Sequence, residues 1–513
     1  MKSLLLILLA ALTYTNPVVF ADYSDPDAIR VGNDYYMTSS SFNCYPGLQI
    51  LHSTDLVNWK LVNAALPRAY AEEHGVEHGN FVWAPSLRYY DGEYYIFWGD
   101  PDRGIYYIHT SDILGAWSEP ELLIEGKGYI DACPYWQGDT LYIAHALAGS
   151  RAGLKSVLLM ATMQRTGKAW KLTDHRIIYD GHEANPTCEG PKIYERNGWY
   201  YIFTPAGGVA TGWQLVLRSK SLYGPFEEKV VLAQQKTSVN GPHQGAWVTT
   251  PDGKDWFLHF QDIGSIGRIV HLQPMKWEND WPVIGENGIP VIRHEAPEGF
   301  KKQEQPTKIV FDFDSTALDF SWQYPHTPDV RWHYCDANKT TLRLYSVPTE
   351  KDAANLWNQP NILLRKIDAP SFTATAEVHF SPSEKFTGER AGLVVMGLNY
   401  SGLMLENTAE GIIAYQTVCR NANKGNQESH SAPIKITNSQ WIYLRLTIKD
   451  SRAYYSISTD NNNFQNIGEP FILKEGVWIG AKYGFVCTRP ALENLKTRND
   501  GGWLDVYWME IKY

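Results

Sequence analysis

One local pattern recurs five times along the first half of the chain and constrains the fold more than any other feature. A short polar turn is followed by a pair of aromatic or apolar residues and then by further apolar residues. The copies are RVGNDYYMTSS, RYYDGEYYIFWG, YWQGDTLYIAHA, YERNGWYYIFTP and TTPDGKDWFLHF. Their second paired residues are Tyr36, Tyr95, Tyr142, Tyr201 and Phe257, which lie 59, 47, 59 and 56 positions apart. Asn-Asp, Asp-Gly and Asn-Gly turns between such runs predict a β-hairpin in each copy.

A second pair of strands is predicted after most of these hairpins, for example in LQILHSTDLVNWKLV and IYYIHTSDILGAWSEPELL. Four short strands in a repeat of about fifty residues are typical of one blade of a β-propeller. Five copies therefore predict a five-bladed β-propeller over residues 16–297.

Length and composition agree with a large, ordered β protein. The chain has 513 residues, more than one domain usually holds, so we expect two domains. Aromatic residues make up 13% of the chain, which favours β structure and supplies surfaces that stack on sugar rings. The net charge of −10 argues against a nucleic acid or an anionic membrane as partner.

The first residues, MKSLLLILLAAL, combine Lys2 with an apolar run that is too short to span a bilayer. This pattern predicts a signal peptide over residues 1–15, with cleavage anywhere between residues 11 and 21. We therefore expect export to the periplasm or the medium. Because no cysteine precedes Cys44 and no later apolar run is long enough to cross a bilayer, we expect no stable membrane anchor.

Six cysteines are too few for a disulfide scaffold in a chain of this length, and their spacing indicates no zinc site. Small buried residues with at most one bridge are the better interpretation. The six are Cys44, Cys133, Cys188, Cys335, Cys419 and Cys487.

Equivalent positions in the five copies place chemically active side chains around one axis. The innermost strand of each blade is expected to begin 11 to 14 residues before the second paired residue. The residues at these positions are Asp25, Trp83, Asp131, Glu189 and His243. Because blades converge on the axis of a propeller, we expect these side chains to form a ring around one pit.

Three carboxyl groups in one pit repel one another when they are charged, so at least one should have a raised pKa. Carboxyl groups whose pKa values are pushed apart are suited to acid–base catalysis. A pair of Asp or Glu residues on either side of a glycosidic bond is the usual apparatus of glycoside hydrolysis. A single Asp before a turn is more often a turn former, but the regular spacing across blades favours a catalytic site here.

The segments NPVVFADYSDPDAIRVGNDYYMTSSSF, WAPSLRYYDGEYYIF, IDACPYW, CEGPKIY and GRIVHLQPMKW resemble glycoside hydrolase family 43. The resemblance spans the expected propeller and, more loosely, the rest of the chain. That family contains α-L-arabinofuranosidases and β-xylosidases on a five-bladed propeller. By this resemblance Asp25 is the general base, Glu189 is the general acid, and Asp131 orients the acid and tunes its pKa.

The resemblance also implies residues that bind the sugar. Arg268 matches an arginine that hydrogen-bonds the sugar, and Phe42 and Trp83 match aromatic walls of the pocket, with ordinary core packing as the alternative for both. His243 matches a histidine that in some relatives lies beside a hydrated calcium ion. No cofactor is expected to be required.

The acid motif reads CEG, where many relatives carry Thr or Ala before the glutamate. Cys188 and Cys133 therefore lie close to the predicted catalytic carboxyl groups, and Cys44 follows Phe42 by two positions. The three cysteines either cluster as apolar walls that raise the pKa of Glu189 or form a bridge.

A linker rich in charge and proline, residues 298–308, precedes a second pattern of alternating stretches. These include KIVFDFD, TLRLYSV, FTATAEVHF, AGLVVMGL, WIYLRLTIK, AYYSISTD, GVWIGAKYGF and DVYWMEIKY. They predict a jelly-roll or concanavalin-like β-sandwich over residues 309–513. In some long relatives this domain lends an aromatic side chain to the pocket; Phe485 or Tyr483 is the candidate, with sandwich core as the alternative.

The sequence thus predicts an exported, inverting exo-glycosidase that acts on hemicellulose or its oligosaccharides. Terminal α-L-arabinofuranosyl units are the expected substrate, with β-D-xylosyl units as the alternative. A more remote alternative is a non-catalytic sugar-binding propeller. A lectin, however, does not need three carboxyl groups at equivalent positions in the blades.

Overall fold

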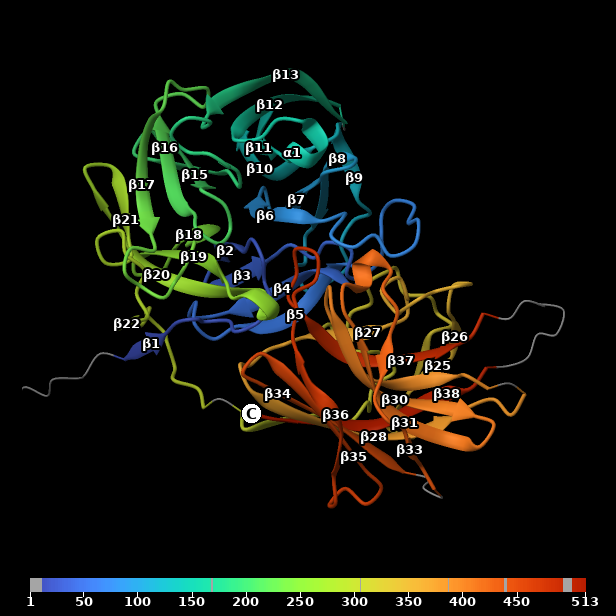
Figure 1. The fold of residues 1–513 in the computed structure, drawn as a ribbon. Helices are drawn as coiled ribbons and strands as arrows, with labels where there is room; N and C mark the ends of the chain where they lie inside the picture. Colours follow the sequence, from blue (N-terminus) through green and yellow to red (C-terminus); the bar gives the residue numbers. More distant parts are fainter. Residues whose placement is uncertain (1–11, 168, 305, 386, 438–440, 492–500) are drawn as a thin grey trace, which may run out of the picture.

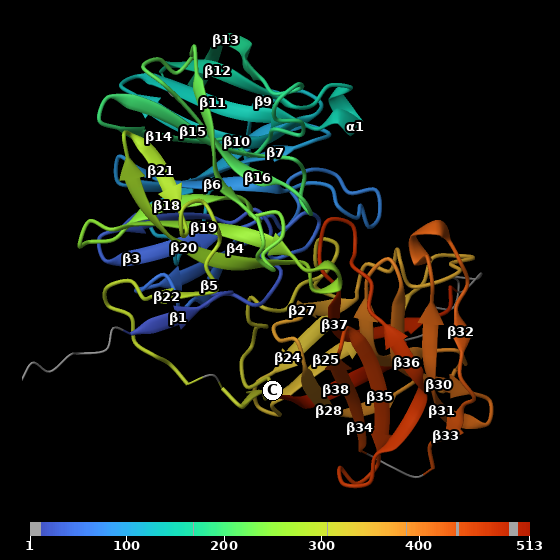
Figure 2. The ribbon, with the colours of Figure 1, turned by 60° about the vertical axis from the view of Figure 1, so that its left-hand side comes forward.

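Five four-stranded antiparallel sheets, arranged around one axis, form the N-terminal part of the computed structural model (Figure 1). The structure describes residues 12–513 except 168, 305, 386, 438–440 and 492–500. The C-terminal part consists of two packed sheets beside this propeller (Figures 1 and 2). The prediction of an all-β fold, a five-bladed propeller followed by a β-sandwich, is confirmed.

Each blade is one continuous stretch of chain whose four strands pair in sequence order. The first two blades are β2 (Asp27–Val31), β3 (Asp34–Thr38), β4 (Gly47–Ser53), β5 (Lys60–Leu66), and β6 (Trp83–Tyr90), β7 (Glu93–Asp100), β8 (Gly104–Thr110), β9 (Glu121–Glu125). The third is β10 (Tyr129–Gln137), β11 (Thr140–Leu147), β12 (Val157–Thr166), β13 (Ala169–Asp180), with the short helix α1 (Gly149–Ala152) between β11 and β12. The last two are β14 (Lys192–Arg196), β15 (Trp199–Ala206), β16 (Trp213–Ser219), β17 (Glu227–Ala233), and β18 (His243–Thr249), β19 (Asp255–Asp262), β20 (Arg268–Glu278), β21 (Trp281–Ile284), with a 3₁₀ turn η1 (Gly264–Ile266) before β20.

The predicted hairpin turns connect the first two strands of each blade. Asp91-Gly92 and Asn197-Gly198 have positive φ at both residues, with values of 50° and 84° and of 53° and 69°. A two-residue type I′ turn requires this conformation, and Asn or Asp followed by Gly adopts it with little strain. The residues that flank these turns are in register, Tyr90 with Glu93 and Arg196 with Trp199.

A small additional sheet joins the two ends of the propeller. β1 (Thr13–Thr15) pairs antiparallel with β22 (Arg293–Glu295). Tyr14 is buried and donates its hydroxyl to Leu272 O at 2.7 Å, and Asn16 Nδ2 donates to the same carbonyl at 2.7 Å. These contacts tie the N-terminal segment to the fifth blade. Residues 13–15, which the expected signal peptide includes, are therefore part of the propeller's structure.

Two eight-stranded sheets form the sandwich. The strands of the first are β23 (Lys308–Phe311), β24 (His333–Asp336), β25 (Thr341–Tyr345), β28 (Phe372–Ser381), β34 (Ile442–Lys449), β35 (Arg452–Ser458), β36 (Gln465–Ile472) and β38 (Trp503–Lys512). Those of the second are β26 (Val347–Pro348), β27 (Leu363–Lys366), β29 (Arg390–Met396), β30 (Tyr400–Thr408), β31 (Gly411–Cys419), β32 (Ser429–His430), β33 (Ile434–Lys435) and β37 (Lys482–Arg489), with a 3₁₀ turn η2 (Ala422–Lys424) after β31.

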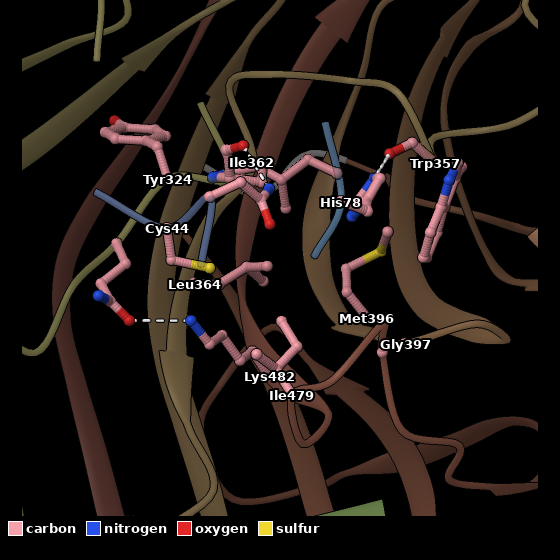
Figure 3. Close-up of a pocket in the computed structure, with 14 residues that line it drawn as sticks. Cys44, His78, Tyr324, Trp357, Ile362, Leu364, Met396, Gly397, Ile479 and Lys482 are labelled. Atoms are coloured by element: carbon pink, nitrogen blue, oxygen red, sulfur yellow. Dashed lines mark hydrogen bonds between the residues drawn. The ribbon is translucent and has the colours of Figure 1, made fainter. Parts of the chain in front are cut away.

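The two domains share an extensive contact. Tyr45 of the propeller and Tyr324 of the sandwich exchange both backbone hydrogen bonds, at 2.9 and 2.8 Å. Beside them lies a small cavity of about 40 Å³ with a largely apolar wall (Figure 3). At one end His78 stacks on Trp357 with 3.7 Å between ring centroids, and at the other Lys482 donates to Gln323 at 2.8 Å. The cavity holds a few water molecules at most, so it is a packing feature of the domain contact.

All six cysteines are buried and unbridged. Cys133 and Cys188 pack in one apolar cluster of the third and fourth blades, whereas Cys44 lines the cavity between the domains. The three cysteines therefore form neither a bridge nor a single cluster around Glu189: Cys133 and Cys188 lie together, and Cys44 lies elsewhere. No helix in the described part of the chain is long and apolar enough to cross a membrane.

Candidate active site

A cavity of about 310 Å³ lies where the innermost strands of the propeller begin. Six of the eight side chains expected in the site line it: Asp25, Phe42, Trp83, Asp131, Glu189 and Arg268. All five blades contribute to this set, the fifth through Arg268 on β20. The cavity therefore exists only when the propeller is closed.

The innermost strands share an unusual backbone conformation at their first residues. Residues with positive φ stand at equivalent places in the five blades: Asp25, Ala84, Asp131, Gly190 and Gln244. In the second, third and fifth blades the strand register also shifts at this point. Such irregularities turn side chains out of the regular alternation of a strand. In this way both Asp131 and the residue before Gly190, Glu189, are directed into the cavity.

Asp25 is buried and held by two side chains. The Ser40 hydroxyl donates to Asp25 Oδ2 at 2.5 Å, and the Ala84 backbone N–H in turn donates to Ser40 Oγ at 2.7 Å. On the other side Arg268 Nη1 lies 3.5 Å from Asp25 Oδ1. These contacts fix the plane of the carboxylate and leave it facing the cavity.

Glu189 is anchored through its backbone while its carboxyl group enters the cavity. The Glu189 N–H donates to Pro205 O at 3.1 Å, and the Thr204 hydroxyl donates to Glu189 O. Burial raises the pKa of Glu189 to about 7, the negative charge of Asp25 adds to this rise, and Arg268 and Lys155 oppose it. A quarter of the side chain remains exposed. Near neutral pH the group therefore exists in both protonation states and can give or take a proton.

Asp131 acts on the backbone next to Glu189. Its Oδ2 accepts a hydrogen bond of 2.7 Å from the Gly190 N–H. Burial raises the pKa of Asp131 well above its usual range, and the charges of Glu189 and Asp25 raise it further, whereas the Gly190 N–H and Lys192 oppose the shift. Asp131 and Glu189 are therefore an electrostatically linked pair, and a proton on one lowers the cost of a charge on the other.

His243 lies behind Glu189 and is fully buried. Its Nε2 is 3.4 Å from Glu189 Oε1. Burial lowers the pKa of His243 to about 3, so the imidazole is neutral at physiological pH. With its proton on Nε2, the neutral ring donates to Glu189 and adds no charge to the cavity.

The comparisons with known proteins agree with this arrangement. The family model for glycosyl hydrolases family 43 matches residues 14–282, and that for the beta xylosidase C-terminal concanavalin A-like domain matches residues 310–512. The chain belongs to glycoside hydrolase family 43. Both domains of this glycoside hydrolase are thus accounted for, and the resemblance expected from the sequence is confirmed.

Among its relatives are proteins with two different names. A putative beta-xylosidase from Xylanibacter ruminicola is 34% identical over 494 residues, covering 93% of this chain and 86% of the relative. A non-reducing end alpha-L-arabinofuranosidase from Bacteroides ovatus is 29% identical over 417 residues, covering 75% and 74%. The solved structure of a xylan beta-1,4-xylosidase from Bacillus halodurans has the same fold, with a TM-score of 0.85 at 21% identity over 97% of this chain and all of the other.

The aromatic walls of the cavity come from both domains of the family 43 enzyme. Phe42 and Trp83 contact each other edge to face, with 6.1 Å between ring centroids. Trp478, on the loop between β36 and β37, packs edge to face on Trp83 at 5.7 Å and also lines the cavity. In Figures 1 and 2 this loop extends from the sandwich toward the propeller. The expected aromatic contribution of the second domain is therefore made by Trp478.

Phe485 and Tyr483 do not reach the cavity. Both lie on β37, are fully buried, and belong to the core between the two sandwich sheets. Phe485 packs parallel to Trp322 at 5.9 Å, and Tyr483 contacts Phe372 at 5.0 Å. The expectation for Phe485 is corrected because the segment that approaches the propeller ends at the start of β37, a few residues earlier.

Gln244 is a site residue that the sequence did not reveal. It follows His243, lines the cavity, and is almost fully buried. Its side-chain Nε2 has no hydrogen-bond partner in the described part of the chain, so it can donate to a ligand. The amide packs so closely on Gly190 that a Cβ there would lie 2.7 Å from Gln244 Cδ, which explains the glycine after Glu189.

A second hollow of about 390 Å³ lies just outside the cavity and shares Val209, Arg268 and Trp478 with it. Asp262 and Glu475 line its outer part. Trp478, which is half exposed, thus stands between the inner cavity and this outer hollow. The part of a substrate beyond the bond to be cleaved has room here.

The surroundings of His243 do not form a protein-ligated calcium site. Calcium takes six to eight oxygen ligands, mostly carboxylate and carbonyl groups. The part of the chain that the structure describes contains no group of three or more His, Cys, Asp or Glu side chains placed to bind one metal ion. The hydrated calcium ion expected beside His243 stays a prediction, and no chemical step below depends on it.

Proposed function

We propose that this protein is an inverting exo-glycosidase that removes one terminal pentosyl unit from hemicellulose-derived chains. Asp25 is the general base that activates a water molecule, and Glu189 is the general acid that protonates the leaving oxygen. Asp131 positions Glu189 through Gly190 and tunes its pKa. Arg268 and Gln244 donate hydrogen bonds to the sugar, and Phe42, Trp83 and Trp478 form the walls around its ring.

The pairing of Asp25 and Glu189 in one closed cavity carries this proposal. Asp25 is held by Ser40 and Arg268, whereas burial raises the pKa of Glu189 to about 7. Two carboxyl groups in such different surroundings can serve as base and acid at the same pH. The cavity, of about 310 Å³, is at the lower end of the size range of ligand sites, roughly 300–1,000 Å³, and suits one sugar ring.

A terminal β-D-xylosyl unit is the first substrate that we propose. From the sequence we expected α-L-arabinofuranosyl units, on the family resemblance together with an expected closed pocket. The most similar relative named above, however, is a putative beta-xylosidase, and the C-terminal domain matches a model described for beta xylosidases. Both sugars are pentoses with similar hydroxyl groups, so the same cavity walls suit either ring.

A terminal α-L-arabinofuranosyl unit is the second candidate, because a non-reducing end alpha-L-arabinofuranosidase from Bacteroides ovatus covers three quarters of this chain at 29% identity. Initial rates on p-nitrophenyl β-D-xyloside and p-nitrophenyl α-L-arabinofuranoside distinguish the two. We expect kcat/KM for the xyloside to be higher. A preference of tenfold or more for the arabinofuranoside, about 1.4 kcal/mol in transition-state binding, would reverse the order. Turnover of neither glycoside, nor of any oligosaccharide, would favour a sugar-binding propeller.

We also infer that the protein is exported, from Lys2 and the apolar run that follows it. Cleavage after Ala21 would remove Tyr14 and Asn16, which hold the N-terminal segment on the fifth blade. We therefore expect cleavage before Thr13. N-terminal sequencing of the protein recovered from the periplasm or the medium tests this, and recovery of the full chain from the cytoplasm would contradict it.

A further inference from the structure

The innermost strands of the propeller also end at a hollow, on the face opposite the catalytic cavity. This hollow has a volume of about 440 Å³ and is lined by residues of β2, β6, β10, β14 and β18. Along β10, Asp131 lines the catalytic cavity and Trp136 lines the hollow. These two residues are five positions apart along a strand that rises roughly 3.3 Å per residue.

Buried charged groups fill the channel between the two sites. Arg88 Nη1 contacts Asp27 Oδ2 at 2.6 Å, and Lys192 Nζ lies 3.9 Å from Asp27 Oδ1. Arg88 Nη2 also contacts Cys133 Sγ at 3.0 Å. The Asp27 and Lys192 side chains are essentially inaccessible to solvent. The hollow is therefore a separate site and not an extension of the catalytic cavity.

Exposed aromatic rings provide a platform at the rim of the hollow. Tyr90 stacks on Trp136, with 4.7 Å between ring centroids and 6° between ring planes. Tyr90 and Tyr89 are 38% and 46% exposed, whereas the other aromatic side chains of the innermost strands are partly buried. Flat aromatic faces that are partly exposed pack well against the C–H face of a sugar ring.

Hydrogen-bonding groups surround this platform. The Tyr89 and Tyr90 hydroxyls make no hydrogen bond within the described residues. Arg30 Nε donates to Thr249 O and Arg30 Nη1 donates to Gly32 O, each at 2.6 Å, and these bonds hold the side chain at the rim. Its Nη2 has no hydrogen-bond partner among the described residues. A ligand that combines an apolar face with many hydroxyl groups fits this mixture of rings and free donors.

We propose that this hollow, defined by Arg30, Tyr89, Tyr90 and Trp136 and called the far-mouth site below, binds a neutral sugar unit of the polymeric substrate. Binding there holds the enzyme on a polysaccharide while the catalytic cavity removes terminal units. The inference rests on the proposed function because it takes a hemicellulose chain as the substrate. The occupant is a saccharide because an anion would offer no apolar face to the rings, and a purely apolar ligand would leave the free donors unpaired.

Binding and activity measurements test the far-mouth site separately from the catalytic cavity. In an inactive Glu189→Gln background, isothermal titration with xylohexaose should show two sites, and Tyr90→Ala should abolish one of them or weaken it about tenfold. In affinity electrophoresis, soluble arabinoxylan should retard the wild-type protein, and Tyr90→Ala, Tyr89→Ala and Arg30→Ala should each reduce this retardation. Tyr90→Phe, which keeps the ring, should retain binding. In the otherwise unchanged enzyme, Tyr90→Ala should leave kcat/KM on the p-nitrophenyl glycoside within twofold.

Tyr334→Ala is the matched control, because Tyr334 is a tyrosine that is 53% exposed on β24 of the sandwich and does not line the hollow. It should change neither measurement. Detection of one saccharide site that Tyr90→Ala leaves unchanged, in a protein that still hydrolyses glycosides, would overturn the inference. The inference would also be overturned if the site bound no saccharide and Tyr90→Ala instead changed the oligomeric state, as measured by sedimentation. Two-site binding without turnover of any glycoside would instead contradict the proposed function and leave the far-mouth site in place.

Discussion

The three carboxyl groups of the cavity have different neighbours, and these neighbours decide which proton each group can move. Asp25 contacts a hydroxyl donor and a guanidinium. Glu189 lies beside a neutral histidine and has a pKa raised to about 7. Asp131 accepts the Gly190 N–H and also lines the cavity. We propose that Asp25 and Glu189 exchange protons with water and substrate, whereas Asp131 positions Glu189 through Gly190.

We predict that Asp25→Asn and Glu189→Gln each lower kcat by a factor on the order of 10² or more, since positioned acid–base groups typically contribute that much. Leaving-group dependence separates the two roles. Glu189→Gln should lose less activity on an aryl glycoside with a good leaving group than on xylobiose, because a good leaving group needs little protonation. Asp25→Asn should lose activity equally on both. Near-wild-type turnover by either variant would contradict the assignment.

The pH dependence of kcat/KM should show the Glu189 proton directly. A general acid must be protonated, so kcat/KM should fall as the pH rises through about 7. Asp131→Asn removes a carboxyl group that is electrostatically coupled to Glu189, so the midpoint of this fall should move. A pH–rate profile of each protein, recorded where both remain folded by circular dichroism, measures this. A basic limb that Glu189→Gln leaves in place would assign it to another group.

The same raised pKa has a consequence for stability. A carboxyl group whose pKa is higher in the folded than in the unfolded protein favours folding at low pH, and this contribution is lost as the pH rises through about 7. We therefore predict that at pH 8 Glu189→Gln has a free energy of unfolding higher than the wild type by on the order of 1–3 kcal/mol. Urea unfolding at pH 8 and pH 5 checks this, because the difference should shrink at the lower pH.

Much of the site was predictable at this scale because the blades repeat. Asp25, Asp131 and Glu189 could be found from their spacing before Tyr36, Tyr142 and Tyr201. Other residues could not. Ser40 is on the loop after β3 and reaches Asp25 only through the fold. Trp478 is far from the propeller in sequence, and only the contact between the domains brings it to the cavity.

At the scale of single elements, the innermost strands match their predicted form at the turn and differ from it at their first residues. Their turns and partners were predictable from Asp-Gly and Asn-Gly pairs, because these dipeptides adopt positive φ with little strain. The irregular conformation at each strand's first residues was not. Asp25 and Asp131 carry the positive φ themselves, whereas Glu189 and His243 precede the residue that does. The side chains around the cavity therefore come either from the residue with positive φ or from the residue before it. For this reason the spacing before the aromatic pairs varied, and Gln244 was not predicted.

The loop that carries Trp478 is the element most open to a direct test. Trp478 has a φ of 64° and contacts Trp83 at the rim of the cavity. The loop approaches so closely that a Cβ on Gly79 would lie 2.5 Å from Val477 Cγ1. We predict that Trp478→Ala lowers kcat/KM about tenfold, mainly through KM, because it opens one wall of the cavity. Trp478→Phe should recover most of the loss.

Trp441→Ala is the control for this change, because Trp441 is also an exposed tryptophan of the sandwich, with 40% of its surface accessible. Within the described residues its aromatic neighbours are His379 and Tyr507, which both belong to the sandwich. This substitution should leave both kinetic constants unchanged. An equal effect of the two substitutions would assign the loss to general destabilisation of the domain.

At the scale of the whole molecule, the order of the blades separates Asp25 from Glu189. β2 contacts β6 and β18, the innermost strands of its two neighbouring blades, whereas β14 contacts β10. Asp25 and Glu189 therefore come from blades that are not adjacent, which leaves room for a sugar and a water molecule between them. Inverting glycosidases separate their carboxyl groups by about 6.5–9.5 Å, and retaining ones by about 5–5.5 Å.

We predict inversion. Proton NMR of the first product, recorded before mutarotation, should show the anomer opposite to that of the substrate. No glycosyl-enzyme should accumulate, and added methanol should not trap the sugar. Retention of configuration, or efficient transfer to methanol, would require Asp25 or Glu189 to act as a nucleophile and would contradict both roles.

Asp22 links the two domains at the edge of the site. Its buried carboxylate accepts the Gly480 N–H of the Trp478 loop at 2.8 Å and the Arg268 N–H at 2.9 Å. The adjacent backbone bond from Ala481 N to Ser265 O, at 2.7 Å, strengthens the same contact. One side chain of the first blade thus contacts both the backbone of Arg268, which lines the cavity, and the loop of the other domain.

A consequence concerns how genes of this kind can recombine. A crossover in the linker, residues 298–308, would look harmless, since it leaves each domain with a complete set of strands. It would nevertheless combine Asp22 from one parent with a Trp478 loop from another, and the shape of the pocket depends on their fit. We therefore expect the two halves to function as one unit. A chimaera should keep the specificity of its propeller parent only when the short segment around Trp478 comes from that parent as well.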